Sequence, residues 1–210
     1  MNVKTDFPKP YVLLLPLVGM GLFVFLYILA AINYPGGSWN FTDQNGFSFR
    51  HNYLCDLLDH YAINGELNTA RFFAQAALGA LCISIILLWF FLPILFSTKS
   101  TNLIIMRWFG VLSLITTLSL ASGTHDIIVR IAGVFGAIAL IIFFVELYKI
   151  QHYKLLMLGI FCLIIFCANY YIYEIGSYIK LLPVLQKITF ICFILWFVLL
   201  DILLYRKLKL

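Results

Sequence analysis

Residues 11–33 read YVLLLPLVGMGLFVFLYILAAIN and contain no charged side chain. An α-helix needs about 20 apolar residues to cross the core of a bilayer. The run therefore predicts a membrane-spanning helix. It is longer than the apolar core of a signal peptide, and no small-residue cleavage site follows it, so we interpret it as a retained helix.

The composition of the whole chain points the same way. Of the 210 residues, 63% are hydrophobic and 11% are charged, whereas about 25% of the residues in a soluble domain are charged. This charge is too sparse to cover a water-facing surface, so lipid is the expected solvent. Six spans are predicted, at about 11–33, 72–97, 103–122, 127–148, 155–175 and 182–205. The predicted fold class is all-α, a six-helix bundle forming one transmembrane domain over residues 1–210.

The basic residues predict how the bundle is oriented. Nine Lys and Arg residues fall on the side of the N-terminus and five on the opposite side. The positive-inside rule then places both termini in the cytoplasm. One long loop, at about 34–71, falls outside. Because the basic residues are scattered between apolar runs, they do not predict a nucleic-acid partner.

The sequence FRHNYLCDLLDH, residues 49–60 of this loop, holds two histidines and two aspartates. If residues 52–61 are helical, four apolar residues share one stripe at spacing i, i+3, i+4 and i+7: Leu54, Leu57, Leu58 and Tyr61. Four polar residues share the opposite face: Asn52, Asp56, Asp59 and His60. We predict a short amphipathic helix on the outer membrane surface with its polar face in water. Such a helix requires no chemistry.

A second interpretation gathers polar residues from several helix ends at one outer mouth. Ionisable side chains at membrane depth are costly and tend to be functional. The candidate ligand-binding residues are His51, Asn52, Asp56, His60, His125, Asp126, Arg130, Asn169, Glu174, Gln186 and Lys187. Alternatives stay open for several of them. Asp126 suits the first turn of the fourth helix and a pair with Arg130, and Glu174 and Lys187 suit an interfacial position.

The mouth also allows a metal hypothesis. We expect no cofactor, and the alternative is a divalent metal such as Zn. Zinc takes three or four N, O or S ligands, and the candidates are His51, Asp56, His125 and Asp126. This site requires the outer loop to fold back over the helix ends. On the cytoplasmic side, we interpret Glu146, near Lys149, and Asp201, near Arg206, as paired or snorkelling structural charges.

A family resemblance is carried by YPGG at 34–37 and NGFSFRHNYLCDLLD at 45–59. These segments resemble bacterial multi-pass membrane proteins of the domain-of-unknown-function 998 type. The matching residues are Gly46, Ser48, Asn52, Asp56 and Leu57, while Cys55 stands where the family has Ser and Leu58 where it has Gly. The pairs at 125–126 and 186–187 are similar too, and the layout also resembles the DRAM-type six-helix proteins. The resemblance implies a six-helix bundle in a bacterial inner membrane and supplies no reaction.

The function expected from these patterns is binding of a lipid, a lipid-like ligand or a membrane partner at the outer mouth. Membrane lipids are the first expected partners and other membrane proteins the second. The alternative is a metal-dependent membrane hydrolase that acts on a lipid through a metal-bound water, so whether the protein is an enzyme stays open. A transporter is least favoured, because no charged residue is predicted at the centre of a span.

Overall fold

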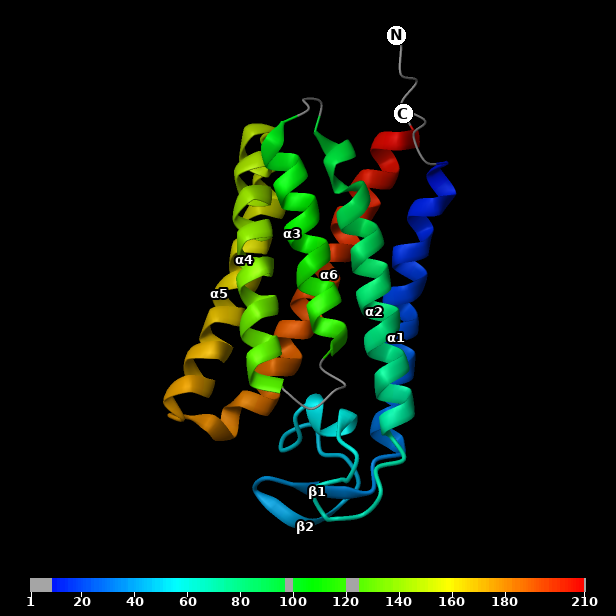
Figure 1. Cartoon of the computed structure of the whole chain (residues 1–210), viewed down its shortest axis with the longest axis vertical. Helices are drawn as coiled ribbons and strands as arrows, with labels where there is room; N and C mark the ends of the chain where they lie inside the picture. Colours follow the sequence, from blue (N-terminus) through cyan, green and yellow to red (C-terminus); the bar gives the residue numbers. More distant parts are fainter. Residues whose placement is uncertain (1–8, 97–99, 120–124, 210) are drawn as a thin grey trace.

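Six long helices run side by side and a compact loop covers one end of them (Figure 1). The computed structural model describes residues 9–96, 100–119 and 125–209. The helices are α1 (Leu14–Ile32), α2 (Arg71–Phe91), α3 (Thr101–Leu118), α4 (His125–Lys149), α5 (Tyr153–Ile175) and α6 (Leu182–Lys209). Short 3-10 turns are η1 (Pro10–Leu13), η2 (Cys55–Leu58), η3 (Leu92–Leu95) and η5 (Ile179–Leu181).

Each of the six helices is long and apolar enough to cross a membrane. The apolar stretches are Tyr11–Ile32, Arg71–Leu95, Thr101–Leu118, Ile127–Lys149, Tyr153–Ile175 and Ile179–Lys209. The prediction of an integral, multi-pass membrane protein with six helical spans is confirmed. The predicted ends agree within a few residues, and predicted positions 97 and 120–122 lie outside the described residues.

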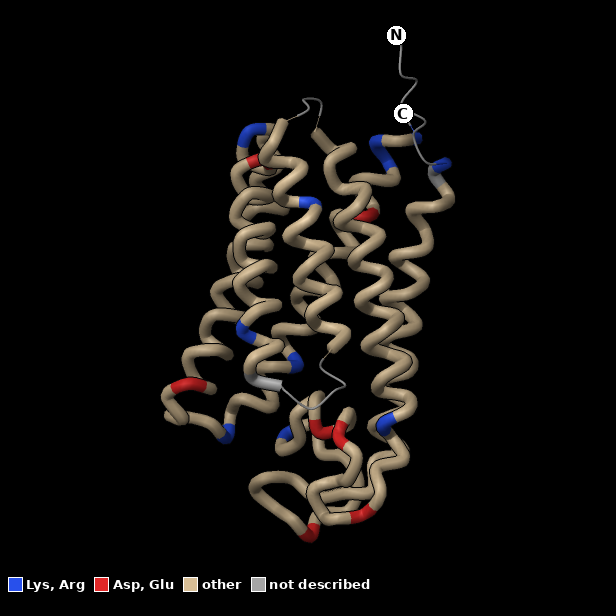
Figure 2. The backbone as a smooth tube through the Cα atoms, in the orientation of Figure 1, with Lys and Arg blue, Asp and Glu red and all other residues tan. Residues whose placement is uncertain are grey.

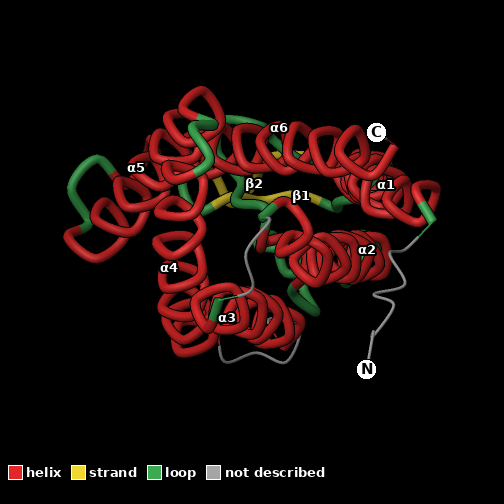
Figure 3. The backbone as a smooth tube through the Cα atoms, turned by 90° about the horizontal axis from the view of Figure 1, so that it is seen from above, coloured by secondary structure: helices red, strands yellow, loops and turns green. Residues whose placement is uncertain are grey.

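The helices form a closed ring in chain order. Each helix packs against the next one, and α6 closes the ring by packing against α1, as the view along the bundle shows (Figure 3). The pair α3 and α4 is held by a hydrogen bond from the Ser113 hydroxyl to the Ala132 carbonyl at 2.8 Å. These two helices, joined by a short connection in the sequence, pack closely together.

The core of the bundle is centred on Trp196 of α6, which is fully buried. Its ring contacts Phe143 and Phe144 of α4, with centroid separations of 5.8 and 5.9 Å. Its indole N–H donates to the Leu155 carbonyl of α5 at 2.9 Å. Gly159 lets α5 come this close, because a Cβ at that position would lie 2.6 Å from atoms of both Phe144 and Trp196. One side chain thus ties α4, α5 and α6 together.

The loop between α1 and α2, residues 33–70, begins with a two-stranded antiparallel hairpin; we call it the outer loop after its predicted side of the membrane. Strand β1 (Gly36–Ser38) pairs with β2 (Phe41–Asn45). The hairpin needs the YPGG sequence, because Gly37 has φ +82° and a Cβ there would collide with the backbone of Asn64. The loop lies at one end of the bundle, and η1 and the end of α6 lie at the other (Figure 1). We call these the loop end and the terminal end.

The prediction of an amphipathic helix over residues 52–61 is wrong. Only residues 55–58 are helical, as the single 3-10 turn η2, and Asp59 is already extended. Only half of the predicted polar face lies in water, because Asn52 and Asp56 are buried while Asp59 and His60 are exposed. Tyr61, which was predicted in the apolar stripe, is exposed. The reason is that side chains, rather than the next helical turn, take up the backbone groups of this segment.

Charged residues lie mostly toward the two ends of the bundle (Figure 2). This distribution fits an apolar middle zone in contact with lipid. Which end faces the cytoplasm stays a prediction from the count of basic residues.

Candidate functional site

Asn52 is the centre of a buried polar network at the loop end. Its side chain is fully buried. The amide donates to the Gly37 carbonyl at 2.7 Å and to the Asp56 carboxylate at 3.1 Å. The carbonyl oxygen accepts from the Ser48 N–H at 2.9 Å and the Gln44 amide at 3.1 Å. All four hydrogen-bonding positions of the amide are therefore occupied inside the protein.

Asp56 is the acid of this network. Its carboxylate accepts from Asn52 and from the Tyr53 N–H at 2.8 Å, which fixes the start of turn η2. Burial raises the pKa of Asp56 above its ordinary value, and the hydrogen bonds from Asn52 and Tyr53 oppose that change. The neighbouring Asp59 raises the pKa further and the Lys187 ammonium lowers it. Desolvation is the larger influence on this carboxyl group.

Lys187 of α6 supplies the cation. It is 3% exposed, and its ammonium donates to the carbonyls of Asn52 and Pro183 at 2.5 and 2.9 Å. The rings of Phe47 and Phe49 lie 5.4 and 5.0 Å from the nitrogen, within the range of cation–π attraction. Two carbonyl dipoles and two aromatic faces therefore solvate a cation that water does not reach.

Two further contacts fasten the loop to the helices. The Leu54 N–H donates to the Gln186 side chain of α6 at 2.9 Å, and the Leu54 carbonyl accepts from the Tyr27 hydroxyl of α1 at 2.9 Å. Cys55, the next residue, is hydrogen-bonded to Gln186, and burial raises the pKa of its thiol to about 12. We call this set the docking network: Tyr27, Asn52, Leu54, Asp56, Gln186 and Lys187. It holds the outer loop over the ends of α1 and α6.

Asn68 is a second hub, which the sequence-based interpretation missed. Its amide donates to the carbonyls of Asp56, Leu57 and Asp59 at 2.9–3.3 Å. Its carbonyl oxygen accepts from the Ala70 N–H, just before α2. A signal for this role was present, because an Asn side chain tends to hydrogen-bond the backbone N–H two residues on and so favours a turn before the next helix.

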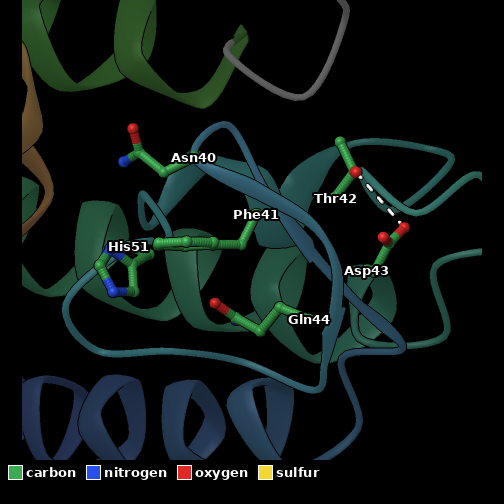
Figure 4. A pocket seen from close by; sticks show the side chains of 6 residues that line it. All are labelled: Asn40, Phe41, Thr42, Asp43, Gln44 and His51. Carbon is green, nitrogen blue, oxygen red and sulfur yellow. Dashed lines mark hydrogen bonds between the residues drawn. The ribbon is translucent and has the colours of Figure 1, made fainter.

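The two histidines of the loop lie apart from the docking network. His51 packs edge-on against Phe41, with a centroid separation of 4.8 Å. It lines a shallow pocket with residues 40–44 of the hairpin (Figure 4). In this pocket Thr42 donates to Asp43, and Phe41 points toward His51. His60 Nδ1 accepts a hydrogen bond from the Arg71 guanidinium of α2 at 2.9 Å.

The metal hypothesis depends on residues that the structure describes only in part. Within the described residues, no three His, Cys, Asp or Glu side chains gather as metal ligands. Helix α4 begins at His125, but the side chains of His125 and Asp126 lie outside the described residues. Whether they approach His51 or Asp56 is therefore not tested, and the metal site stays a prediction.

The remaining candidates lie between helices α4, α5 and α6. Arg130 of α4 donates to Glu174 of α5 at 2.7 Å, and 56% of its side chain is exposed. Asn169 of α5 donates to the Thr189 hydroxyl of α6 at 2.5 Å and to the Ile165 carbonyl at 2.9 Å. The Asn169 side-chain oxygen is buried and has no hydrogen-bond partner within the described residues. The ion pair of Arg130 is thus with Glu174, while its predicted pair with Asp126 lies outside the described residues.

The two acids at the terminal end behave differently from each other. Glu146 is paired with Lys149 at 2.6 Å, as predicted. The interpretation of Asp201 as paired or snorkelling is wrong, because its side chain is fully buried and its two oxygens have no hydrogen-bond partner within the described residues.

The nine candidates whose side chains the structure describes are therefore spread over separate places, and His125 and Asp126 stay outside the described residues. The docking network is closed and internally satisfied, the loop histidines contact Phe41 and Arg71, and Arg130–Glu174 is an exposed ion pair near the ends of α4 and α5. Comparison with known proteins adds no assignment: no family model, curated protein or solved structure matches this chain.

Proposed function

We propose that this multi-pass membrane protein binds a phospholipid, and that the lipid phosphate contacts Arg130. The observation that carries the proposal is the exposed guanidinium of Arg130, which Glu174 holds beside the loop-end half of α5. An arginine has five N–H donors, and a single nitrogen of Arg130 serves Glu174. The guanidinium keeps donors for a phosphate oxygen, the acceptor that arginine binds with charge-assisted hydrogen bonds.

The position of the pair along the helices supports a headgroup ligand. Glu174 is the residue before the last one of α5, and Arg130 is in the second turn of α4. Three exposed tyrosines surround the end of α5: Tyr170, Tyr171 and Tyr173. Tyrosines gather at the level of lipid headgroups because one end of the side chain is apolar and the other polar. The phosphate of a neighbouring lipid lies at this depth.

Asn169 is a second polar group near this pair. It lies five residues before Glu174 in α5, closer to the middle of the membrane, and its side-chain oxygen lacks a partner within the described residues. A buried carbonyl oxygen without a partner is costly. The outer loop has a supporting role in this proposal, because the docking network fixes the ends of α1 and α6.

The location and the family are also proposals. The excess of basic residues on the side of the termini supports an orientation with both ends in the cytoplasm, and the resemblance of residues 45–59 to the domain-of-unknown-function 998 type supports a bacterial inner membrane. The matching residues Asn52 and Asp56 share one buried network, which gives that short motif a structural purpose.

The test is lipid retention by the purified full-length chain, measured by native mass spectrometry in detergent with added phosphatidylglycerol, phosphatidylethanolamine or diacylglycerol. We expect both phospholipids to bind better than diacylglycerol, which lacks the phosphate. The Arg130→Gln variant should bind phospholipid about fivefold more weakly, because a partly exposed charged contact contributes about 1 kcal/mol. The matched control is Lys180→Gln, which removes another exposed positive charge near the end of α5.

Two outcomes would contradict the proposal. Equal losses in Arg130→Gln and Lys180→Gln would mean that general positive charge, not a site, retains the lipid. Equal retention of diacylglycerol and phospholipid by the wild type would mean that no phosphate is recognised. A Glu174→Gln variant identifies the headgroup: if the ammonium of phosphatidylethanolamine contacts Glu174, this variant loses that lipid and keeps phosphatidylglycerol.

A further inference from the structure

Asp201 is a carboxylic acid inside the bundle that the docking network and the proposed lipid site leave unused. It lies in α6, eight residues before the end of the helix, with a fully buried side chain. Neither carboxyl oxygen has a hydrogen-bond partner within the described residues. Nearly all buried polar groups in proteins are hydrogen-bonded, so such an exception requires an explanation.

The other acid at the terminal end gives a direct comparison. Glu146 is also buried, but the Lys149 ammonium lies 2.6 Å from its carboxylate. This fold therefore satisfies one buried carboxylate with a basic residue one helical turn away. Asp201 has no such neighbour, because no residue three or four positions away from it along α6 is basic, and Leu204, one turn on, is apolar and fully buried.

Among the described residues, the elements packed against α6 offer no ion-pair partner to Asp201. These elements are η1, α1, η3, α5 and η5, and Trp196 adds a contact with α4. The sequences of η1, α1 and η3 contain no charged residue. The described charged residues on α4, α5, η5 and α6 have other contacts or are exposed. Arg130 pairs with Glu174, Glu146 pairs with Lys149, Lys187 lies in the docking network and Lys207 donates to the Leu95 carbonyl. Lys154 and Lys180 are exposed, and Arg206 and Lys209 lie in the last turns of α6.

An ionised carboxylate without a partner is strongly disfavoured in an apolar interior, whereas the neutral acid is tolerated. We propose that Asp201 is a proton-binding site, whose carboxyl group holds a proton while the terminal half of α6 is packed against η1 and η3. The proton comes from water at the terminal end and forms the O–H bond of the acid. Its loss leaves a bare carboxylate in the core and favours separation of α6 from these neighbours. Proton binding and the packing of α6 are thus linked.

Infrared spectroscopy tests the protonation state directly. The full-length chain, labelled with ¹³C at the aspartate carboxyl groups, is placed in lipid nanodiscs at about pH 7. We expect a carbonyl band of a protonated aspartic acid that Asp201→Asn removes. Because Asp56 is also buried, Asp56→Asn is the matched control, and it should leave this band in place. A wild-type spectrum in which every aspartate is ionised at this pH would overturn the proposal.

Stability against pH supplies a second measurement with its own sign. If the packed state holds a proton that the unpacked state releases, the thermal midpoint of the wild type falls as the pH rises from about 5 to about 9. Asp201→Asn keeps the volume of the side chain and cannot ionise, so its midpoint should be higher than that of the wild type at the alkaline end. A midpoint that is lower by the same amount at every pH would make Asp201 a packing residue and refute the proton site. If Asp201→Asn does not fold, the infrared spectrum of Asp56→Asn decides, because Asp201 is then the remaining buried aspartate among the described residues. A protonated-aspartate band that remains at about pH 7 supports the proposal, and loss of the band refutes it.

Discussion

Replacing Asn52 by alanine should open the fold of the outer loop, because the hydrogen-bond partners of its side chain all lie in that loop. The change removes four hydrogen bonds, to Gly37, Gln44, Ser48 and Asp56, at 2.7–3.1 Å within a fully buried site. A net contribution of about 1 kcal/mol for each neutral bond, and somewhat more for the bond to a carboxylate, gives roughly 4–5 kcal/mol. Every 1.4 kcal/mol is tenfold in an equilibrium constant, so opening of the loop should become about 1,000-fold to 3,000-fold more frequent.

The native Cys55 reports this opening. It is the residue after Leu54 in the docking network, and burial raises the pKa of its thiol to about 12, so the closed loop should react slowly with maleimide. The alkylation rate, measured on the peptide that contains Cys55, should rise in Asn52→Ala in proportion to the opening constant. The protein is used in its membrane or in nanodiscs, so that the helices stay in place.

Asn40→Ala is the matched control, because Asn40 lies in the same loop, at the exposed turn of the hairpin. Its rate should equal that of the wild type. If Asn52→Ala also labels at the wild-type rate, the four hydrogen bonds of Asn52 do not hold the loop closed and the argument is wrong. Equal acceleration in both variants would refute it too, by showing that the whole loop responds to any change.

Three further predictions follow from the same geometry. Burial raises the pKa of Asp56 above its ordinary value of 3.8, so the docked loop binds more protons than the released loop. Docking should therefore be strongest at low pH and weaken as the pH rises from 3.8 to the raised pKa. The rate of amide exchange at Tyr53, corrected for its intrinsic pH dependence, should follow this trend in the wild type and lose it in Asp56→Asn. Gly159→Ala should lower the thermal midpoint, because overpacking costs about 1–3 kcal/mol of stability. The control Gly21→Ala, where a Cβ meets nothing within 4 Å, should leave the midpoint unchanged. Equal midpoints for the two variants would contradict the packing of α5. An impermeant maleimide should reach Cys55 of Asn52→Ala from outside the cell, and labelling in inverted vesicles alone would reverse the predicted orientation.

The membrane character of the chain was predictable because it rests on local composition. The run at 11–33 and its five counterparts each meet the length and apolarity requirement of a span without reference to any other part of the chain. The pair Glu146–Lys149 was predictable for the same reason, since residues three apart on a helix are neighbours.

The conformation of the outer loop was not predictable from its period of apolar residues. Leu54, Leu57 and Leu58 have helical spacing, yet the Asn68 amide takes the carbonyls of this segment from ten or so residues away. Partners distant in the chain, such as Gln186 and Lys187, then replace water as the surroundings of Asn52 and Asp56. A pattern within ten residues contains no information about contacts across 130.

The sequence by itself determined the solvent, the number of spans and their approximate ends, because burial in lipid depends on the residues of each segment alone. Only the tertiary structure decided which polar residues share a site. It closed Asn52, Asp56 and Lys187 into an internal network, left Arg130 exposed beside Glu174, and placed Asp201 in the core without a partner. The physical reason is that the desolvation and pairing of a polar group depend on what other segments bring to it.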